Sequence, residues 1–337
     1  MKTSVVTLSA LGQKIATLAA NPASDPDFKT LLNQVHLSNG WFTTQQVQTA
    51  LHSWAQALQA DKLTKWLTPY STSVTPRTIG LILAGNIPFV GLHDLLCIWV
   101  SGHHAQVKCA SKDPYLLPWL VGVLESHSPE NKGRIQFVDR LQDYDAVIAT
   151  GSNNSARYFE HYFTSVPHLI RKNRNAVAVL DGTESAEQYT ALGDDILRYY
   201  GLGCRNVAKV CVPKGFDLDL IFGGLYPYQS VMENQKYANN YDYNKAVFLM
   251  SEFPFLENGF FMLRESNDWA APIACLHYTY YDDLATISQQ LQQNEEQIQC
   301  VISSLEIPNA IPLGKAQEPE LWDYADGVDT LTFLQQL

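Results

Sequence analysis

Apolar residues recur at helical spacing in the first part of the chain, and the rhythm changes after about residue 77. Near the N-terminus they predict an amphipathic helix, with an apolar side made by Leu8, Leu11, Ile15 and Leu18. Thr43 and Gln46 have the spacing of a capping box and predict the start of a second helix. That helix is expected to bury Val47, Leu51, Trp54 and Leu58. Residues 1–70 are therefore predicted to be all-helical.

Short apolar runs alternate with helical segments from residue 78 onwards, after a Pro-, Ser- and Thr-rich stretch at 69–76 that predicts a linker. The first set of predicted strands lies at 78–84, 105–109, 134–138 and 146–150. The second set lies at 176–180, 207–212, 259–263, 273–278 and 298–302, with helices predicted at 186–200 and in the Gln-rich stretch 288–299. The Tyr- and Asn-rich region 223–245 gives no readable pattern. The alternation predicts an α/β protein with doubly wound parallel sheets, and two sets of strands predict two domains.

Composition excludes several classes of protein. The chain has 23 Lys and Arg against 34 Asp and Glu, a formal net charge of −11. Since no stretch collects the basic residues, we expect no nucleic-acid or anionic-membrane surface. Hydrophobic residues make up 46% of the chain, which excludes disorder for most of it. The longest uncharged apolar stretch, 78–92, is shorter than the roughly 18–20 residues of a membrane span, and Gln13 and Lys14 interrupt any signal-peptide core.

Six cysteines without a CxxC pair or clustered histidines predict neither a metal site nor a disulfide framework, so we expect a cytoplasmic protein. Cys204 stands apart from the cysteines in apolar contexts such as LLCIW, because it lies in the turn YGLGCRN between a predicted helix and a predicted strand. An exposed thiol beside the backbone amides of such a turn suits a nucleophile. A glycine helix cap with an incidental cysteine explains the local sequence equally well.

Asn86 lies in the segment GNIPF directly after the first predicted strand of the first sheet. Ligands of open α/β sheets bind at the carboxyl ends of the strands, so its amide is a candidate hydrogen-bond donor to a ligand. An Asx turn before Pro88 is the simpler explanation of this asparagine on local sequence alone.

Two further strand ends carry polar residues. Lys108 and Ser111 follow the second strand, although a lone lysine at a strand end is usually just solvated. Thr150, Gly151 and Ser152 follow the fourth strand, where Ser152 is either a helix N-cap or part of a helix N-terminus that binds a pyrophosphate. No GxGxxG motif and no P-loop are present, which argues against an ordinary Rossmann dehydrogenase or a nucleoside triphosphatase.

Taken in order, a strand with GNIP, a strand with VKCAS, a strand with TGS and a later GxGC turn resemble the aldehyde dehydrogenase superfamily. The counterparts there are WNFP-like, KP-S/A-E-like, FTGS-like and GQxC-like, and the resemblance spans residues 77 to about 280. Within the superfamily, the short length, GLGCRNV, the helical start and the C-terminal LWDYADGVDTLTFL are most similar to the LuxC-type fatty acyl-CoA (acyl-protein) reductases. The resemblance implies an aldehyde-dehydrogenase-like α/β fold, with two doubly wound parallel-sheet domains and an N-terminal helical segment.

The resemblance also implies a division of the chain. Its expected parts are an N-terminal helical segment (1–70), a cofactor-binding domain (71–170), a catalytic domain with the nucleophile Cys204 (171–318) and a C-terminal segment (319–337).

The implied roles are those of a thiol enzyme with a nicotinamide cofactor. Cys204 is the acyl-accepting nucleophile and Asn86 an oxyanion donor. The implied cofactor site consists of Lys108 and Ser111 at the adenosine ribose, Thr150, Gly151 and Ser152 at the pyrophosphate, and Asp268 at the nicotinamide ribose, with Glu265 as a second candidate there. Ser111 stands where NAD-preferring relatives carry a glutamate, and its small side chain leaves room for a 2′-phosphate beside Lys108, so NADPH is the expected cofactor.

One departure bears on the reaction. The segment of hydrolytic members that carries a general-base glutamate corresponds here to 168–175, HLIRKNRN, which has no carboxylate. Leu169 takes the place of that glutamate, with helical geometry assumed, and His168 is a weaker substitute base. Without a base to activate water, a thioester on Cys204 is expected to be discharged by a thiol or by hydride. The implied activity is the NADPH-dependent reduction of a fatty acyl thioester, acyl-CoA or acyl-protein, to an aldehyde.

The expected partners are the fatty acyl thioester and coenzyme A, with an acyl-protein synthetase or an acyl carrier as further candidates. Homo-oligomerisation stays open, because the chain is shorter than a usual superfamily member. Two alternatives stand beside this activity: an NAD(P)-dependent aldehyde dehydrogenase acting oxidatively, and a non-catalytic relative that partners an acyl-protein synthetase.

Overall fold

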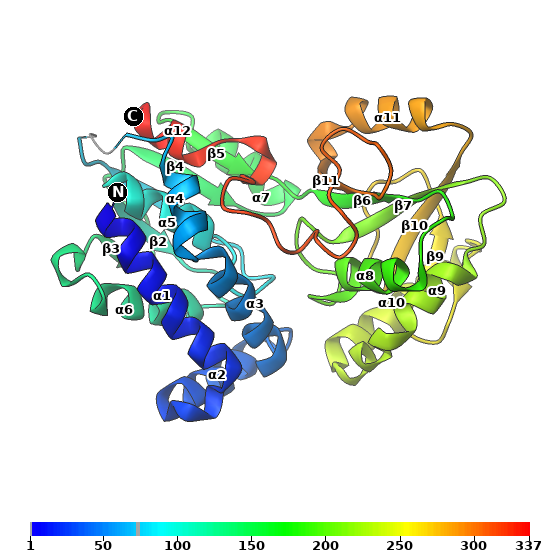
Figure 1. Cartoon of the computed structure of the whole chain (residues 1–337), viewed down its shortest axis with the longest axis horizontal. Coiled ribbons are helices and arrows are strands. Elements are labelled where there is room, and N and C mark those ends of the chain that lie inside the picture. The colour runs from blue at the N-terminus through cyan, green and yellow to red at the C-terminus, as the bar shows by residue number, and fades with distance from the viewer. Residues whose placement is uncertain (1, 72–74) are drawn as a thin grey trace. The chain divides into compact units, whose positions relative to one another are not determined.

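The computed structural model describes residues 2–71 and 75–337, which divide into two compact units (Figure 1). The first unit comprises the chain up to Lys172 together with Glu320–Leu337, and the second is Asn173–Pro319. The C-terminal segment thus returns to the first unit. Residues 72–74 of the predicted linker lie outside the described residues.

The first unit is built on a five-stranded parallel sheet with the order β3-β2-β1-β4-β5. In that order the strands are Ile135–Phe137, His104–Lys108, Thr78–Ile82, Ala146–Thr150 and His168–Arg171. The chain builds outward from β1 through β2 to β3 and then crosses to the other side of β1 with β4. Ligands of open α/β sheets bind at such a point, outside the carboxyl ends of the strands.

Helices form the crossovers between the parallel strands, as parallel pairing requires. They are α5 (Leu92–Ser101) between β1 and β2, α6 (Leu116–Ser126) between β2 and β3, and α7 (Asn153–Tyr162) between β4 and β5. Helix α5 is flanked by Gly91 and Gly102 with φ of 79° and 95°, a left-handed conformation that favours glycine. Most of its side chains are buried, so it packs between the sheet and outer helices.

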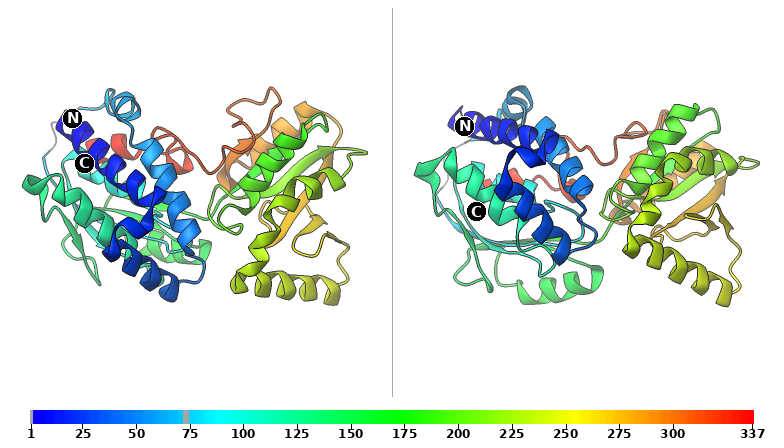
Figure 2. Two further views of the ribbon diagram at one scale, coloured as in Figure 1. Left: turned by 60° about the horizontal axis from the view of Figure 1, so that its bottom comes forward. Right: turned by 90° about the horizontal axis from the view of Figure 1, so that it is seen from below.

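Four N-terminal helices form that outer layer, drawn in blue shades in Figure 2. They are α1 (Lys2–Ala20), α2 (Pro26–Ser38), α3 (Thr44–Ala57) and α4 (Ala60–Leu67). The four leucine and isoleucine side chains predicted for the apolar side of the first helix are all buried. Thr43 caps α3 by accepting a hydrogen bond from the Gln46 amide. The prediction of an all-helical start is confirmed for the described residues.

The second unit contains a six-stranded sheet with the order β11-β6-β7-β10-β9-β8, parallel except for β8 against β9. In that order the strands are Ile298–Ile302, Asn175–Val179, Val207–Pro213, Cys275–Tyr281, Met262–Glu265 and Leu256–Glu257. Helix α11 (Leu284–Gln293) covers one face, and α8 (Ala186–Leu197) with α9 (Asp219–Leu225) covers the other (Figure 1). The predicted fold class, α/β with doubly wound parallel sheets, is confirmed.

The region 223–245, which gave no readable pattern, is helical. After the end of α9 it forms a 3-10 helix at Tyr226–Glu233 and then α10 (Gln235–Met250). The buried side of α10 consists of Tyr237, Tyr241, Asn244 and Phe248. Their spacing is helical, but three of the four carry polar groups, so a search for aliphatic periodicity misses it.

Three local predictions are corrected. Residues 168–171 form the edge strand β5 rather than a helix, because they pair with β4 from Val147–His168 to Thr150–Arg171. The helical geometry assumed around Leu169 is therefore wrong. The strands predicted at 259–263 and 273–278 begin only at Met262 and Cys275, since turns precede both.

The C-terminal segment is anchored by a buried ion pair. Arg171, at the end of β5, donates two hydrogen bonds to the Asp94 carboxylate of α5, from Nη2 at 2.6 Å and from Nε at 3.0 Å. The same guanidinium donates to the Ala325 carbonyl at 2.7 Å and to the Thr330 hydroxyl at 2.8 Å. Arg171 thereby joins β5, α5 and the returning C-terminal segment, which includes α12 (Thr330–Gln335).

We expect Asp94→Asn to lower the free energy of unfolding by about 3 kcal/mol, because it leaves the Arg171 guanidinium buried without its main counter-charge. Urea unfolding followed by circular dichroism measures this. The matched control is Glu160→Gln, which breaks the exposed pair of Glu160 with Lys172 and is expected to cost less than about 0.5 kcal/mol. Equal losses in the two variants would contradict the anchoring role of Asp94.

Candidate active site

The polar strand ends of the first unit lie at one edge of its sheet. Ile82, the last residue of β1, is in register with Lys108 of β2 on one side and with Ala149 of β4 on the other. The segments that follow these three strands therefore leave the sheet at the same level. The structure thus places the ends of the strands that precede the candidate residues of the first unit at one edge of the sheet.

Asn86 is exposed in the segment that joins β1 to α5. A hydrogen bond holds the backbone of this segment: the buried Asn39 donates through Nδ2 to the carbonyl of Gly85 at 3.1 Å. A Cβ atom on Gly85 would lie 2.8 Å from the Cβ of Ala110, so only glycine fits this approach of the segments after β1 and β2. An exposed amide on an anchored backbone can donate a hydrogen bond to a ligand.

Lys108 and Ser111 are both exposed. Lys108 Nζ donates to the Asp139 carbonyl at 2.6 Å, which holds the ammonium at the carboxyl edge and leaves it further donors for a phosphate. Sequence reasoning missed Asp113, a buried carboxylate that accepts from the Leu116 amide at 3.2 Å. Burial raises its pKa to about 6. The available signal in the sequence was an aspartate directly before Pro114 and the apolar helix α6.

Ser152 is the N-cap of α7, and its hydroxyl accepts a hydrogen bond from the Ser155 amide at 3.2 Å. The capping explanation considered for this serine is correct. The same turn has no room for a side chain at Gly151, where a Cβ would lie 2.8 Å from the Ser155 Cβ and 3.0 Å from the Phe159 ring. Thr150 ends β4 just before it. The N-terminus of α7 follows Gly151 directly, at the end of the strand where the chain crosses to the other side of β1. Backbone amides at such a helix N-terminus can bind a pyrophosphate, so the residues present suit a dinucleotide.

Cys204 of the second unit lies in the turn between α8 and β7. Tyr200, Gly201 and Gly203 have φ of 57°, 78° and 96°, so the chain turns through three left-handed residues just before the cysteine. Its thiol is half-buried. The next residue, Arg205, is held by the Ala316 carbonyl, to which its Nη1 donates at 3.2 Å.

Other cysteines are in a different environment. Cys97, Cys211 and Cys275 are buried, and burial raises the pKa of each thiol, to about 12 for Cys275. Burial also raises the pKa of the half-buried Cys109 to about 11. A thiol of that pKa is thiolate to about one part in ten thousand at pH 7. These four cysteines are therefore unsuited to nucleophilic attack near neutral pH.

Asp268 is exposed in the segment between β9 and β10. Its carboxylate accepts from the Ser266 hydroxyl at 3.2 Å, and its amide donates to the same hydroxyl at 3.2 Å. Glu265, the second candidate, is exposed at the end of β9. The contacts beneath this segment include two buried side chains that sequence reasoning missed, Lys209 and His277. The available signal was a charged or titratable residue inside each of the runs VAKVCV and CLHYTY.

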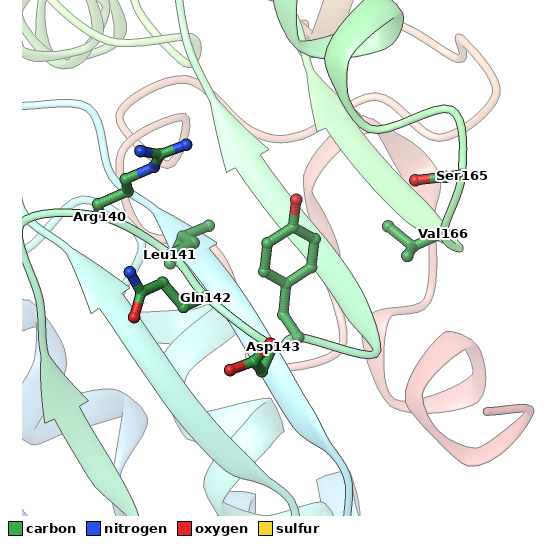
Figure 3. A pocket seen from close by; sticks show the side chains of 7 residues that line it. Arg140, Leu141, Gln142, Asp143, Ser165 and Val166 are labelled. Carbon is green, nitrogen blue, oxygen red and sulfur yellow. The ribbon is translucent and has the colours of Figure 1, made fainter.

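An open, polar concavity lies elsewhere in the first unit (Figure 3). Its lining residues are Arg140, Leu141, Gln142, Asp143, Tyr144, Ser165 and Val166. They precede β4 and β5, so the concavity lies toward the amino ends of these strands, away from the carboxyl edge. Within residues 2–71 and 75–337, no three His, Cys, Asp or Glu side chains gather in a way that could hold a metal ion. None of the described helices is both long and apolar enough for a membrane span.

No protein-family model matches the chain, and no curated protein matches its sequence. Solved structures do match. Aldehyde dehydrogenase 21 from Physcomitrella patens, in complex with the reaction product succinate, gives a TM-score of 0.61 at 11% identity over 90% of this chain and 79% of that one. The aldehyde dehydrogenase KauB from Pseudomonas aeruginosa gives a TM-score of 0.64 at 11% identity over 89% of this chain and 71% of that one.

An aldehyde dehydrogenase from Mycobacterium tuberculosis, complexed with NAD+, gives a TM-score of 0.57 at 15% identity over 85% of this chain and 69% of that one. Identities this low show the fold and not the reaction. The resemblance to the aldehyde dehydrogenase superfamily is confirmed at that level: this chain has the α/β fold of the solved aldehyde dehydrogenases.

Proposed function

We propose that the protein reduces a fatty acyl thioester to an aldehyde with NADPH, through a thioester on Cys204. The observation that carries the proposal is the contrast between Cys204, half-buried in a glycine turn, and the four cysteines whose thiols burial keeps protonated. The sixth, Cys300, is also half-buried but lies within strand β11 and not in a turn. A LuxC-type reductase is the closest description of this activity, supported by the GLGCRNV turn and by the sequence of the C-terminal segment.

The acyl transfer needs a nucleophile and a place for negative charge. The Cys204 sulfur forms a bond to the acyl carbonyl carbon, and the thiol of coenzyme A or of a carrier leaves with the proton that Cys204 gives up. The tetrahedral species carries an oxyanion, for which the Asn86 amide and the Cys204 backbone N–H are the proposed donors. Loss of one such donor typically costs about 2.7 to 4 kcal/mol of transition-state stabilisation.

The proposed cofactor contacts are those suggested by sequence. Lys108 and Ser111 bind the adenosine ribose and its 2′-phosphate, the Thr150-Gly151-Ser152 turn binds the pyrophosphate, and Asp268 accepts from the nicotinamide ribose. Bound NADPH supplies the hydride that takes the acyl group to the aldehyde level. The exposed Lys108 ammonium and the bare Gly151 turn support these assignments.

The residues at 168–175 bear on which product, aldehyde or fatty acid, is expected. Leu169 lies on β5 and no carboxylate is present in this segment. His168 directs Nδ1 at the Val166 carbonyl, 2.9 Å away, and is half-buried. Since this segment supplies no carboxylate to activate water, aldehyde rather than fatty acid is the expected product. An oxidative aldehyde dehydrogenase and a silent partner of an acyl-protein synthetase are the rival functions.

Incubation with a radiolabelled fatty acyl-CoA and no reductant is expected to leave a stable thioester on Cys204, which hydroxylamine cleaves and NADPH discharges as aldehyde. The thioester persists because no base activates water. Gel autoradiography, peptide mass spectrometry and product analysis measure the three steps.

Cys204→Ala removes the label, whereas Cys211→Ala, the matched control, retains it. Normal acylation of Cys204→Ala would sink the assignment, and fatty acid as the main product with NADPH present would show that water is activated.

Selective thiol reactivity separates an enzyme from a silent partner. At pH 7, iodoacetamide is expected to modify Cys204 at least about tenfold faster than Cys109 or Cys275, because only the thiolate reacts and burial suppresses it at those two sites. Time-resolved peptide mass spectrometry gives the rates. A non-catalytic scaffold has no reason to keep one reactive cysteine, so uniform slow labelling favours that alternative.

Cofactor preference tests Ser111. We expect NADPH to bind more tightly than NADH, and Ser111→Glu to reverse the order, because a carboxylate at this position repels the 2′-phosphate and accepts from the ribose hydroxyls. Titration of nucleotide fluorescence gives both dissociation constants. Ser111→Gln, similar in size to glutamate but uncharged, separates charge from bulk. Equal affinities of the unmodified protein for the two nucleotides would refute the assignment.

A further inference from the structure

Lys209 of β7 and His277 of β10 form a buried polar pair in the sheet of the second unit. The two residues are register partners on adjacent parallel strands, so their side chains lie on the same face. Lys209 is 3% exposed and His277 is 2% exposed. A buried ammonium and a buried imidazole are costly unless something compensates them.

Both side chains contact the segment 266–269, which follows β9. Lys209 Nζ donates to the Ser266 carbonyl at 3.0 Å and lies 4.7 Å from the centre of the Trp269 ring. His277 Nδ1 lies 3.3 Å from the Asp268 carbonyl, to which the ring donates when that nitrogen carries the proton. The pair therefore holds the backbone before and at Asp268, while the Asp268 carboxylate itself stays exposed.

Stability alone does not explain the pair. His277 Nε2 is buried and has no hydrogen-bond partner among the described residues. An unsatisfied buried polar atom is unfavourable, and apolar side chains of similar volume commonly replace buried charged groups without loss of stability. What the pair does supply is a fixed backbone under one exposed carboxylate.

We propose that Lys209 and His277 are positioning residues that hold the segment 266–269 so that the Asp268 carboxylate is ready to accept from the ribose hydroxyls of a nicotinamide nucleotide. The proposal rests on the proposed function, in which Asp268 contacts that ribose. A carboxylate on a fixed backbone binds more tightly than one on a free segment, because less conformational entropy is lost on binding.

Burial and the charged groups around His277 make the positioning of the segment 266–269 depend on pH. Lys209 and Arg264 oppose a positive charge on the ring and Asp268 favours one, but burial is the largest effect and lowers the pKa of His277 below its ordinary value. Nδ1–H can donate to the Asp268 carbonyl in either protonation state, but a charged ring is unfavourable in this buried place. The neutral ring is therefore the form that stays buried against the segment, and protonation as the pH falls through the lowered pKa favours displacement of the ring together with the segment. Nucleotide binding is expected to weaken on that acid side.

Three variants test the proposal. Lys209→Met keeps the volume and removes the charge and the hydrogen bond. His277→Asn keeps an amide donor near the place of Nδ1 and cannot be protonated. Thr279→Val is the matched control, because Thr279 lies two residues along the same strand and bonds to Cys211 Sγ instead of the segment 266–269. Two readouts are amide hydrogen exchange of residues 266–274 and the dissociation constant of NADPH between about pH 5.5 and 8.

We expect Lys209→Met to speed exchange in 266–274 and to weaken NADPH binding about tenfold, with the rate of Cys204 acylation unchanged. His277→Asn is expected to bind NADPH normally at pH 8 and to lose the acid-side weakening, and Thr279→Val to change neither readout. Unchanged exchange, or unchanged NADPH affinity, in Lys209→Met overturns the positioning role.

Failure of the proposed function has a different signature. In that case the unmodified protein binds no nicotinamide nucleotide at any pH and forms no acyl thioester, which overturns both proposals together. If the unmodified protein binds NADPH and the Lys209→Met protein binds it equally well, only the positioning role is wrong.

Discussion

The buried ion pair of Arg171 with Asp94 is the contact on which the first unit depends most. Arg171 ends β5, and the chain enters the second unit two residues later. When the chain returns after Pro319, its last segment closes onto the same guanidinium through the Ala325 carbonyl and the Thr330 hydroxyl. A single side chain thus joins three parts of the sequence, β5, α5 and the C-terminal segment. Removing the Asp94 charge would leave the buried guanidinium only its longer ion pair with Asp326, at 3.7 Å.

The carboxyl edge of the same sheet carries polar side chains rather than a buried ion pair. Two contacts hold this edge: the Asn39 side chain donates to the Gly85 carbonyl, and Lys108 Nζ donates to the Asp139 carbonyl. Asn86 and Ser111, which follow β1 and β2, are exposed. An edge that is rigid in its backbone and polar in its side chains can bind a dinucleotide without first paying to order its own loops.

The sequence was informative wherever a pattern has one physical cause. Apolar runs of five to seven residues between helical segments indicated most strands of both sheets, but not β5 or β8. Turn residues at strand ends placed Asn86, Lys108 and Ser152 after strands that end at one edge, because parallel strands end at the same level. The hydrophobic pattern did not predict positions where polar side chains are buried. The sheet position of Lys209 and the tyrosine-lined face of α10 depend on hydrogen bonds between distant segments, which local hydrophobicity does not report.

The turn that carries Cys204 shows how far this dependence reaches. Tyr200 has a φ of 57°, a conformation that costs a bulky residue energy and persists only when its surroundings impose it. Its buried ring packs on Tyr237 of α10, with ring centres 6.2 Å apart, and the Tyr237 hydroxyl donates to the Phe260 carbonyl at 3.1 Å. The backbone that presents the cysteine is therefore held by the helix whose pattern could not be read. Glycine spacing alone identified the turn, but the conformation of that turn comes from an aromatic contact between residues 37 positions apart in the chain.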